Sequence, residues 1–447
     1  MFQETKEDSF PPLPRYINQN GVWLDERVNL RETEGSLLVA EIMQQLPLVK
    51  DRQRAMSEDN HHQMQCALKA ILANGLRCRY FRDPAVIAYF RKSDGYAGND
   101  GRPTWLSGKV LSRIVDDLEG LGFVKSYAGS RGRSSRFELT DTLAEMGKAY
   151  GITEDSITAD IRNDELVRLR ETNASSNYVD FKPTAETKAW SQALEAYNRF
   201  IVAQSLSVQL SSHLTEQWID CLNLNKPRSS PGFTKPEMFQ TALYRQFNNT
   251  DFRQGGRLYG GWWIQAPKSV REQILINGNP VVELDYSGCH ISMLYHQRGL
   301  ECPDDPYALS EVEEVARKAG GDPRIYRSCI KQYTQGLING KKGGRPDRIE
   351  LSQEATVPPG FKSTDLIALI ERKHQPISDS FRSNAGLVLQ REDSDIALEI
   401  ISNLTNSGIP VLPIHDSFIV EAGRTGILKE EMERIYQRKF GFLPNIK

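Results

Sequence analysis

The chain has 447 residues, of which 39% are hydrophobic and 26% are charged, which is an ordinary balance for a globular protein of several domains. Its apolar runs are too short to span a membrane and its six cysteines are too scattered for a disulfide framework, so we expect a cytoplasmic protein without a membrane partner. The net charge of −2 means that any contact with nucleic acid has to use local basic patches.

Two helices and a hairpin are predicted near the start of the chain. Apolar residues recur at helical spacing through residues 63–76 and again through residues 107–121. Strand-like segments at 123–127 and 136–139 then flank a tip rich in glycine, serine and arginine. Helices followed by such a hairpin resemble a winged helix-turn-helix.

Basic residues of this region fall on two features that would face DNA. Lys109 and Arg113 lie near one exposed face of the 107–121 helix, which is expected to enter the major groove. The hairpin tip would contact the DNA backbone or the minor groove through Arg131, Arg133 and Arg136. The alternative is a winged helix that docks another protein or domain, because the fold alone does not imply DNA binding.

The middle of the chain is predicted to be helical. Residues 141–185 are polar and acidic, and residues 160–165 favour a helical connector. Trp190, Leu194, Tyr197 and Ile201 follow at spacings of four, three and four, which is typical of a helix with one buried face. These helices would supply either a reduced thumb that holds duplex product or a plain helical bridge.

Two aspartates each end a strand-like run in the second half of the chain. Asp285 follows the β-rich residues 281–284, and Asp416 lies between residues 409–412 and 418–420, which read as the arms of a hairpin. Adjacent strands would bring both carboxylates to one site. Nucleotidyl transfer uses two divalent ions about 3.5–4 Å apart. Magnesium needs one or two carboxylates beside substrate phosphates, so two aspartates suffice for two Mg²⁺ ions, for which Mn²⁺ can substitute.

A basic helix is predicted between the two aspartates. If residues 327–340 are helical, Arg327, Lys331 and Gln335 share one face. Two cations one turn apart suit a triphosphate, since both can pair with phosphate oxygens. The alternative is a solvated basic helix face without a ligand.

The motifs around these residues carry a family resemblance. Asp285 opens the triplet Asp285-Tyr286-Ser287, and Asp416 is the centre of His415-Asp416-Ser417. With these triplets the chain resembles the superfamily of family A DNA polymerases and single-subunit phage-type RNA polymerases, whose catalytic domain is a right hand of palm, fingers and thumb. The first triplet follows the DNA enzymes and the second follows the RNA enzymes.

Three further segments match the superfamily in order and spacing. The fingers motif is matched by Arg327, Lys331 and Gly340, although Asn339 replaces the expected tyrosine. Residues 255–258 resemble the segment whose arginine, here Arg257, touches the primer-template minor groove. Residues 390–396 resemble the helix, led here by Gln390, that follows the duplex. The resemblance covers roughly residues 250–425.

The resemblance implies a role for each matching residue. Asp285 and Asp416 would ligate both metal ions, Lys331 would neutralise the pyrophosphate leaving group, and Arg327 would bind the γ-phosphate. His415 would support the primer end. The nucleotide would also contact Tyr286, His290 and Asn339. His290 stands where the DNA enzymes carry a glutamate that crowds the ribose 2′-hydroxyl, and the bulk of its imidazole favours deoxynucleotides.

The sequence thus predicts an α+β protein with a winged helix-turn-helix joined to a compact right-hand polymerase domain of antiparallel palm sheet, helical fingers and reduced helical thumb. Its expected parts are an N-terminal arm and helix, the winged-helix-like domain, the helical connector with thumb, and the palm and fingers, over residues 1–50, 51–150, 151–247 and 248–447.

The expected activity is that of a small, specialised DNA-directed DNA polymerase without proofreading, for gap or end filling, the replication of a mobile element, primer synthesis or an antiviral role. Its partners would be nucleoside triphosphates and a DNA primer-template or an RNA-containing duplex. One alternative is a single-subunit RNA polymerase or primase-like enzyme, which His415-Asp416-Ser417 favours. Another is a degenerate polymerase that acts as a DNA-binding regulator. The sequence predicts no oligomeric state.

Overall fold

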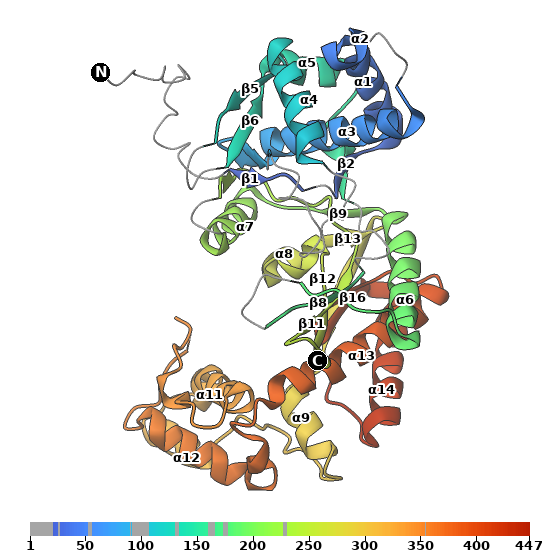
Figure 1. The fold of residues 1–447 in the computed structure, drawn as a ribbon. Helices are drawn as coiled ribbons and strands as arrows, with labels where there is room; N and C mark the ends of the chain where they lie inside the picture. Colours follow the sequence, from blue (N-terminus) through green and yellow to red (C-terminus); the bar gives the residue numbers. More distant parts are fainter. Residues whose placement is uncertain are drawn as a thin grey trace, which may run out of the picture.

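The computed structural model describes residues 21–25, 27–51, 56–89, 91, 107–129, 134–159, 166–172, 178–226, 230–353 and 355–447. These residues form a mixed α+β fold, as the sequence predicts. Figure 1 shows an N-terminal unit above a central sheet, and a lobe containing α11 and α12 below that sheet. Within the described ranges, no helix combines the length and the apolar character that crossing a membrane requires.

The N-terminal unit packs four helices and a short helical turn around a four-stranded sheet with its own hydrophobic core. The helical elements are α1 (Glu32–Gln45), α2 (Pro47–Lys50), α3 (Glu58–Phe81), α4 (Gly108–Gly120) and α5 (Asp141–Ala149). The sheet has the order β1-β4-β6-β5, made by Val22–Trp23, Ile87–Tyr89, Ser135–Leu139 and Val124–Tyr127. The predicted order of helix, helix and hairpin is therefore present in α3, α4 and β5–β6.

Arg136 corrects the prediction for the hairpin. It lies inside β6, which pairs with β5 on one side and β4 on the other, and only 2% of its surface is exposed. A side chain buried in a central strand cannot reach a phosphate, so Arg136 is a structural residue of this sheet. Arg131 and Arg133 lie outside the described residues.

The connector contains strands where a helix was expected. Strand β7 (Ile157–Ala159) pairs with β2 (Val28–Leu30) in the N-terminal unit, and β8 (Val167–Leu169) pairs with β11 (Tyr244–Asn248) in the other half of the chain. β-branched side chains at Ile157, Thr158 and Val167 suit extended backbone, and β2 and β11 supply the pairing. Residues 160–165 lie outside the described part of the chain.

A buried ionic cluster fixes the N-terminal unit to the rest of the molecule. Arg77 and Arg82 at the end of α3 both pair with Glu237, at 2.8 and 2.9 Å. The strand β3 (Arg82–Asp83) pairs with β10 (Gly232–Phe233) beside them. Burial alone would raise the pKa of Glu237, but the two arginines lower it, so this carboxylate is ionised and locked in place.

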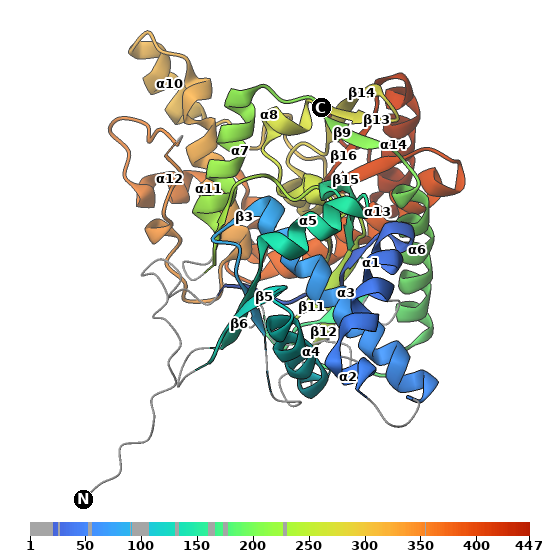
Figure 2. The same cartoon turned by 90° about the horizontal axis from the view of Figure 1, so that it is seen from above.

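The central sheet is antiparallel throughout, with the order β15-β16-β14-β13-β9. Its strands are Val411–Ile414, Ser417–Glu421, Asn279–Asp285, Ile274–Ile276 and Leu206–Val208. Helices α6 (Ala185–Val202), α13 (Ala385–Asn406) and α14 (Thr425–Phe440) lie on one side of the sheets, as Figures 1 and 2 show. The predicted helix through Trp190 and Ile201 is α6, whereas α7 (Ser212–Asn225) lies on the opposite side in Figure 1.

A second sheet of three strands, β12-β11-β8, lies next to the first. Its strand β12 (Asp251–Tyr259) contains Gly255 and Gly256, which both have positive φ at a bulge opposite β11. A Cβ on Gly256 would lie 2.9 Å from the Ser394 hydroxyl of α13. Glycine is therefore required there for close approach of the strand to the helix.

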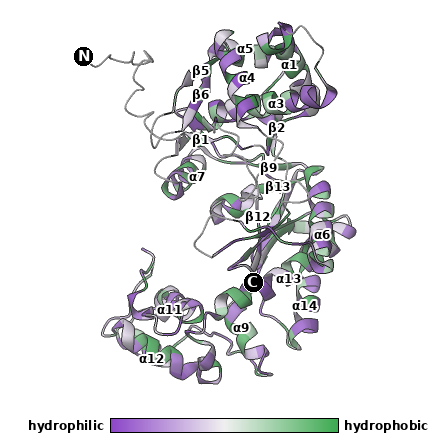
Figure 3. Cartoon of the chain, viewed as in Figure 1, coloured by the Kyte–Doolittle hydropathy of each residue, from purple (hydrophilic) through white to green (hydrophobic). Residues whose placement is uncertain are grey.

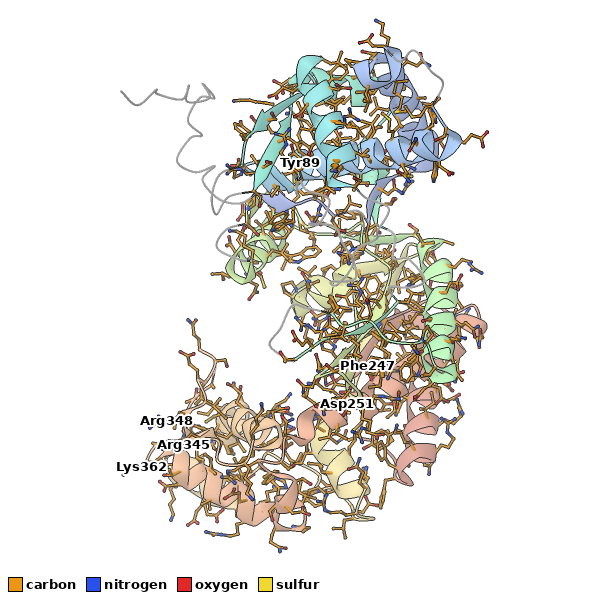
Figure 4. The ribbon with its side chains drawn as sticks, viewed as in Figure 1. Tyr89, Phe247, Asp251, Arg345, Arg348 and Lys362 are labelled. Carbon is orange, nitrogen blue, oxygen red and sulfur yellow. The ribbon has the colours of Figure 1, made fainter. Side chains whose placement is uncertain are left out.

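The helical lobe consists of α10 (Ser310–Lys318), α11 (Arg327–Asn339) and α12 (Ser363–Lys373). The short helix α9 (Cys289–His296) leads from β14 toward it, and α8 (Lys268–Arg271) lies by the central sheet. Figure 3 shows α9 as largely hydrophobic, which fits its burial. Arg345, Arg348 and Lys362 lie together at the outer edge of the lobe (Figure 4).

Candidate active site

Asp285 and Asp416 lie side by side at the end of the central sheet. Asp285 is the last residue of β14, where it pairs in register with Ser417 of β16. Asp416 occupies the turn between β15 and β16, and the Tyr286 N–H donates to its carbonyl at 3.2 Å. The adjacency predicted from the two strand-like runs is therefore present.

A cavity of about 140 Å³ opens at this point and collects most of the residues singled out in the sequence. The sheet contributes Asp285 and Asp416. Helix α11 contributes Lys331, Gln335 and Asn339. Tyr286, directly after β14, also lines it, and the remaining predicted residues come from β12, α9 and α13, and are Arg257, His290 and Gln390. Lys331 and Asn339 are exposed, so this cavity joins the surface on the side of α11.

The two aspartates carry negative charge that the surrounding side chains only partly balance. Burial of the Asp285 carboxyl and the neighbouring Asp416 charge raise the pKa of Asp285 to about 7, while Lys331 and Lys268 act in the opposite direction. A cation placed between the Asp285 and Asp416 carboxyl groups would stabilise their ionised forms.

The donor set fits magnesium that is shared with a substrate. Two carboxylates with open space in front of them are what a Mg²⁺ ion uses when phosphate oxygens and water complete its shell. Within the described ranges, no group of three or more His, Cys, Asp and Glu side chains forms a closed metal cage.

Asp393 organises the opposite wall of the cavity. Its carboxylate lies on α13 and accepts from the Arg257 guanidinium at 2.6 Å and pairs with His290 Nε2 at 2.8 Å. The side chain of Asp393 is 1% exposed. Burial alone would raise the pKa of Asp393, but the hydrogen bond from His290 and the charge of Arg257 lower it. The triad of Arg257, Asp393 and His290 is thus internally balanced.

The side chain of Tyr286 is not available to a nucleotide, which corrects the prediction. Tyr286 is 3% exposed, its hydroxyl donates to the Met432 carbonyl at 2.7 Å, and its ring packs against Tyr436 and Phe418. Alternation along β14 directs Asp285 and Tyr286 to opposite sides of the strand. Only the backbone of Tyr286 can contribute to the cavity.

Arg327 lies one helical turn from Lys331 but outside the residues that line the cavity. Its guanidinium pairs with Asp305 at 3.1 Å and lies 4.8 Å from the centre of the Tyr307 ring. The helix over residues 327–339 is present as predicted, and Arg327 is held at the outer end of its basic face. A phosphate contact by Arg327 requires that it leave Asp305.

The turn that carries Asp416 is strained and braced. His415 has a φ of +58°, an uncommon conformation for a residue with a side chain, and such strain concentrates at functional sites. Burial and the nearby Arg257 lower the pKa of His415, so its ring is neutral at pH 7. The Ser417 hydroxyl donates to Glu283 at 2.8 Å, and Arg271 pairs with the same carboxylate. These contacts hold Ser417, the residue that follows Asp416.

Two of the other predicted nucleic-acid contacts lie in the N-terminal unit, away from the cavity. Lys109 and Arg113 are exposed on α4 in the N-terminal unit, separated by four residues and therefore on one face of the helix. The wing contacts expected from Arg131 and Arg133 fall outside the described residues.

Sequence reasoning missed Asp393 and Tyr307. Asp393 follows Gln390 by three positions on α13, so helical spacing could have placed it on the same face as that cavity residue. Nothing in the local sequence distinguishes Tyr307, which lines the cavity from a turn before α10.

The sequence matches no model of a known protein family and no curated protein. The function of the cavity is therefore inferred from the residues that line it.

Proposed function

We propose that the protein is a magnesium-dependent, nucleic-acid-templated nucleotidyl transferase related to family A polymerases, and most specifically a small DNA-directed DNA polymerase. The observation that carries the proposal is the meeting of Asp285 and Asp416 in one cavity with Lys331 on the facing helix. Two carboxylates and a cation around an open space are the minimum that phosphoryl transfer with bound metal requires.

Each residue of the cavity has its own role in the proposed reaction. Asp285 and Asp416 would hold the metal ions, which supply charge neutralisation for the attacking 3′-hydroxyl and the leaving pyrophosphate when bound. Lys331 stabilises the negative charge that develops on the leaving group. The backbone carbonyl of Tyr286 offers a further oxygen next to Asp285.

Selection of the sugar is assigned to His290. Its ring is buried, with 7% of the residue exposed, and the bond to Asp393 fixes it in one orientation at the cavity wall. A fixed imidazole occupies space that a ribose 2′-hydroxyl would otherwise use, which favours deoxynucleotides. The triad of Arg257, Asp393 and His290 therefore acts as a rigid wall for the sugar and the primer end.

The N-terminal unit is proposed to be a winged helix that holds the template duplex. Lys109 and Arg113 on α4 provide the cations for phosphate contacts. The helix α7, on the opposite side from α6, takes the place of a reduced thumb.

Incorporation on a primed template tests the proposal and separates it from its rivals. Primed DNA is incubated with Mg²⁺ and each dNTP or rNTP singly, and extension by the templated nucleotide is measured. We expect templated dNTP incorporation that stops when the metal is chelated. Templated extension with rNTPs alone would support the RNA polymerase suggested by Ser417. Tight DNA binding without extension under any condition would support a regulator and contradict the proposed activity.

A further inference from the structure

Residues 445–447 lie against the end of β14 that carries Asp285. Helix α14 ends at Phe440, and the chain then runs back to the end of the central sheet, where Figures 1 and 2 mark it with the letter C. Ile446 lies opposite Tyr286 in an isolated antiparallel bridge. We call residues 445–447 the bridging segment.

Both main-chain polar groups of Asp285 bond to the bridging segment. The Asp285 N–H donates to the Lys447 main-chain oxygen at 2.9 Å, and the Lys447 N–H donates to the Asp285 carbonyl at 3.0 Å. The Ser287 N–H donates to the Asn445 carbonyl at 2.8 Å. On its other side, β14 pairs with β16 in register at Asp285 and Ser417. The backbone of Asp285 is therefore held between β16 and the bridging segment.

The strand β13, which neighbours β14 in the central sheet, does not reach this position. It pairs with β14 at Asn279 and Pro280, whereas β16 follows β14 to its last residue, Asp285. The bridging segment therefore completes the sheet on the side of Asp285 that faces away from β16. Without it, the N–H and C=O groups of Asp285 would form an open sheet edge, and strand ends without such partners fray.

Packing anchors the bridging segment on α9 and on the hydrophobic core. Phe442, which precedes it, stacks on the His296 ring of α9 with 4.5 Å between the ring centres. Ile446 packs against the core. Asn445 and Lys447 are exposed, and within the described range 355–447 none of the three residues of the segment lines the cavity. Any effect of the segment on the cavity therefore has to pass through its backbone bonds.

We propose that the bridging segment positions the Asp285 carboxylate in the cavity by fixing the backbone that carries it. Asp416, its partner in the proposed metal site, lies in the turn between β15 and β16. The two carboxylates keep their separation only if the end of β14 stays aligned with that hairpin. A displacement of about 1 Å at a catalytic site can cost about 10²-fold in rate. Lys447 touches no reacting atom and is a positioning residue.

Three variants isolate the hydrogen bond that the Lys447 N–H donates. K447P removes this donor, because proline has no backbone N–H. K447A keeps the N–H and removes only an exposed side chain, so it is the matched comparison. N445P is the proline control, since the Asn445 N–H bonds to no described residue and the Asn445 carbonyl is retained. Circular dichroism should show all three variants folded.

The inference rests on the proposed function for its effect on metal binding and catalysis, and hydrogen exchange tests the backbone contact without either. Deuterium uptake by a peptide that contains residues 285–287 should be faster in K447P. The affinity of K447P for Mn²⁺ with a non-hydrolysable triphosphate should fall about 10-fold. Its kcat should also fall about 10-fold, with the KM for primed DNA unchanged. K447A and N445P should match the wild type in every measurement.

The outcomes separate this inference from the proposed function. Wild-type Mn²⁺ affinity and kcat in K447P would overturn the inference, and extension by the wild type would leave the proposed function standing. A wild type that neither binds Mn²⁺ nor extends primers would contradict the proposed function, and exchange alone would then decide the inference. Faster exchange at residues 285–287 in K447P but not in K447A would support it, and equal exchange in the two variants would overturn it.

Discussion

The carboxylates that line the cavity and the carboxylate buried behind its wall differ in how their charge is balanced. Asp393 is buried, yet His290 and Arg257 surround it and lower its pKa. Asp285 is accessible, yet burial within the cavity and the charge of Asp416 raise its pKa to about 7. The negative charge of Asp393 is balanced by protein side chains, whereas the charges of Asp285 and Asp416 are not. Asp393 therefore positions Arg257 and His290, whereas Asp285 and Asp416 are the carboxylates that we propose bind a cation.

The largest expected effect follows from removing either unbalanced carboxylate. D285N and D416N should each lower templated incorporation by about 10³-fold or more, because the shared metal loses half of its protein ligands. Thermal denaturation should show both variants folded. D304N, which changes an exposed aspartate outside the cavity, is the control and should retain full activity. Normal extension by D285N or D416N would remove that residue from the site.

Removal of the Lys331 side chain, which faces the two aspartates, should have the next largest effect. K331A should lower kcat by about 10²-fold, because the charge developing on the leaving group loses its partner. Substitution of Lys318, an exposed lysine of α10 paired with Glu314, provides the comparison and should leave kcat unchanged. Single-turnover rates at saturating nucleotide separate this loss from weaker binding. An effect on KM alone would make Lys331 a binding residue only.

Substitution of Asp393 in the triad with Arg257 and His290 should lower the stability of the protein. D393N leaves the Arg257 guanidinium without its buried partner, so the free energy of unfolding should fall by about 3 kcal/mol. Chemical denaturation measures this loss, and D285N under the same conditions should not show it. A D393N protein as stable as the wild type would mean that the triad does not hold this wall together.

The pH dependence of the melting temperature should show the smallest effect, and it is the effect most specific to Asp285. Because the pKa of Asp285 is raised from the usual 3.8 to about 7, the folded protein keeps a proton that the unfolded chain has lost, so the metal-free protein should lose stability as pH rises from about 4 to about 7 and change little above that. The melting temperature of the wild type in chelator should therefore fall across that range, and Mg²⁺ should restore it at pH 8. D285N lacks this titration and should show neither change. A wild-type curve that is flat across that range would contradict the account.

The parts of the site that lie on regular, periodic segments could be predicted from the sequence. Apolar, β-rich runs before Asp285 and on either side of Asp416 specified three strands, and the pairing of β14 with β16 placed both carboxylates together. Helical spacing put Lys331 and Gln335 on one face of α11.

The remainder depends on contacts between distant segments. Asp393 meets Arg257 across 136 residues of sequence, and local pattern contains no sign of that pairing. Tyr286 and Arg136 were predicted to face ligands because of motif or charge, yet both are buried by the neighbouring strands and helices. The connector strands β7 and β8 exist because β2 and β11, which are distant in the sequence, pair with them.

Metal binding by Asp285 and Asp416 is the central claim, and electron paramagnetic resonance with Mn²⁺ tests it most directly. Binding is titrated in the presence of a non-hydrolysable nucleoside triphosphate, for the wild type, D285N and D416N. We expect the wild type to bind Mn²⁺ together with the triphosphate, and either substitution to weaken the Mn²⁺ affinity by at least about tenfold. Equal Mn²⁺ affinity in all three proteins would contradict the central claim.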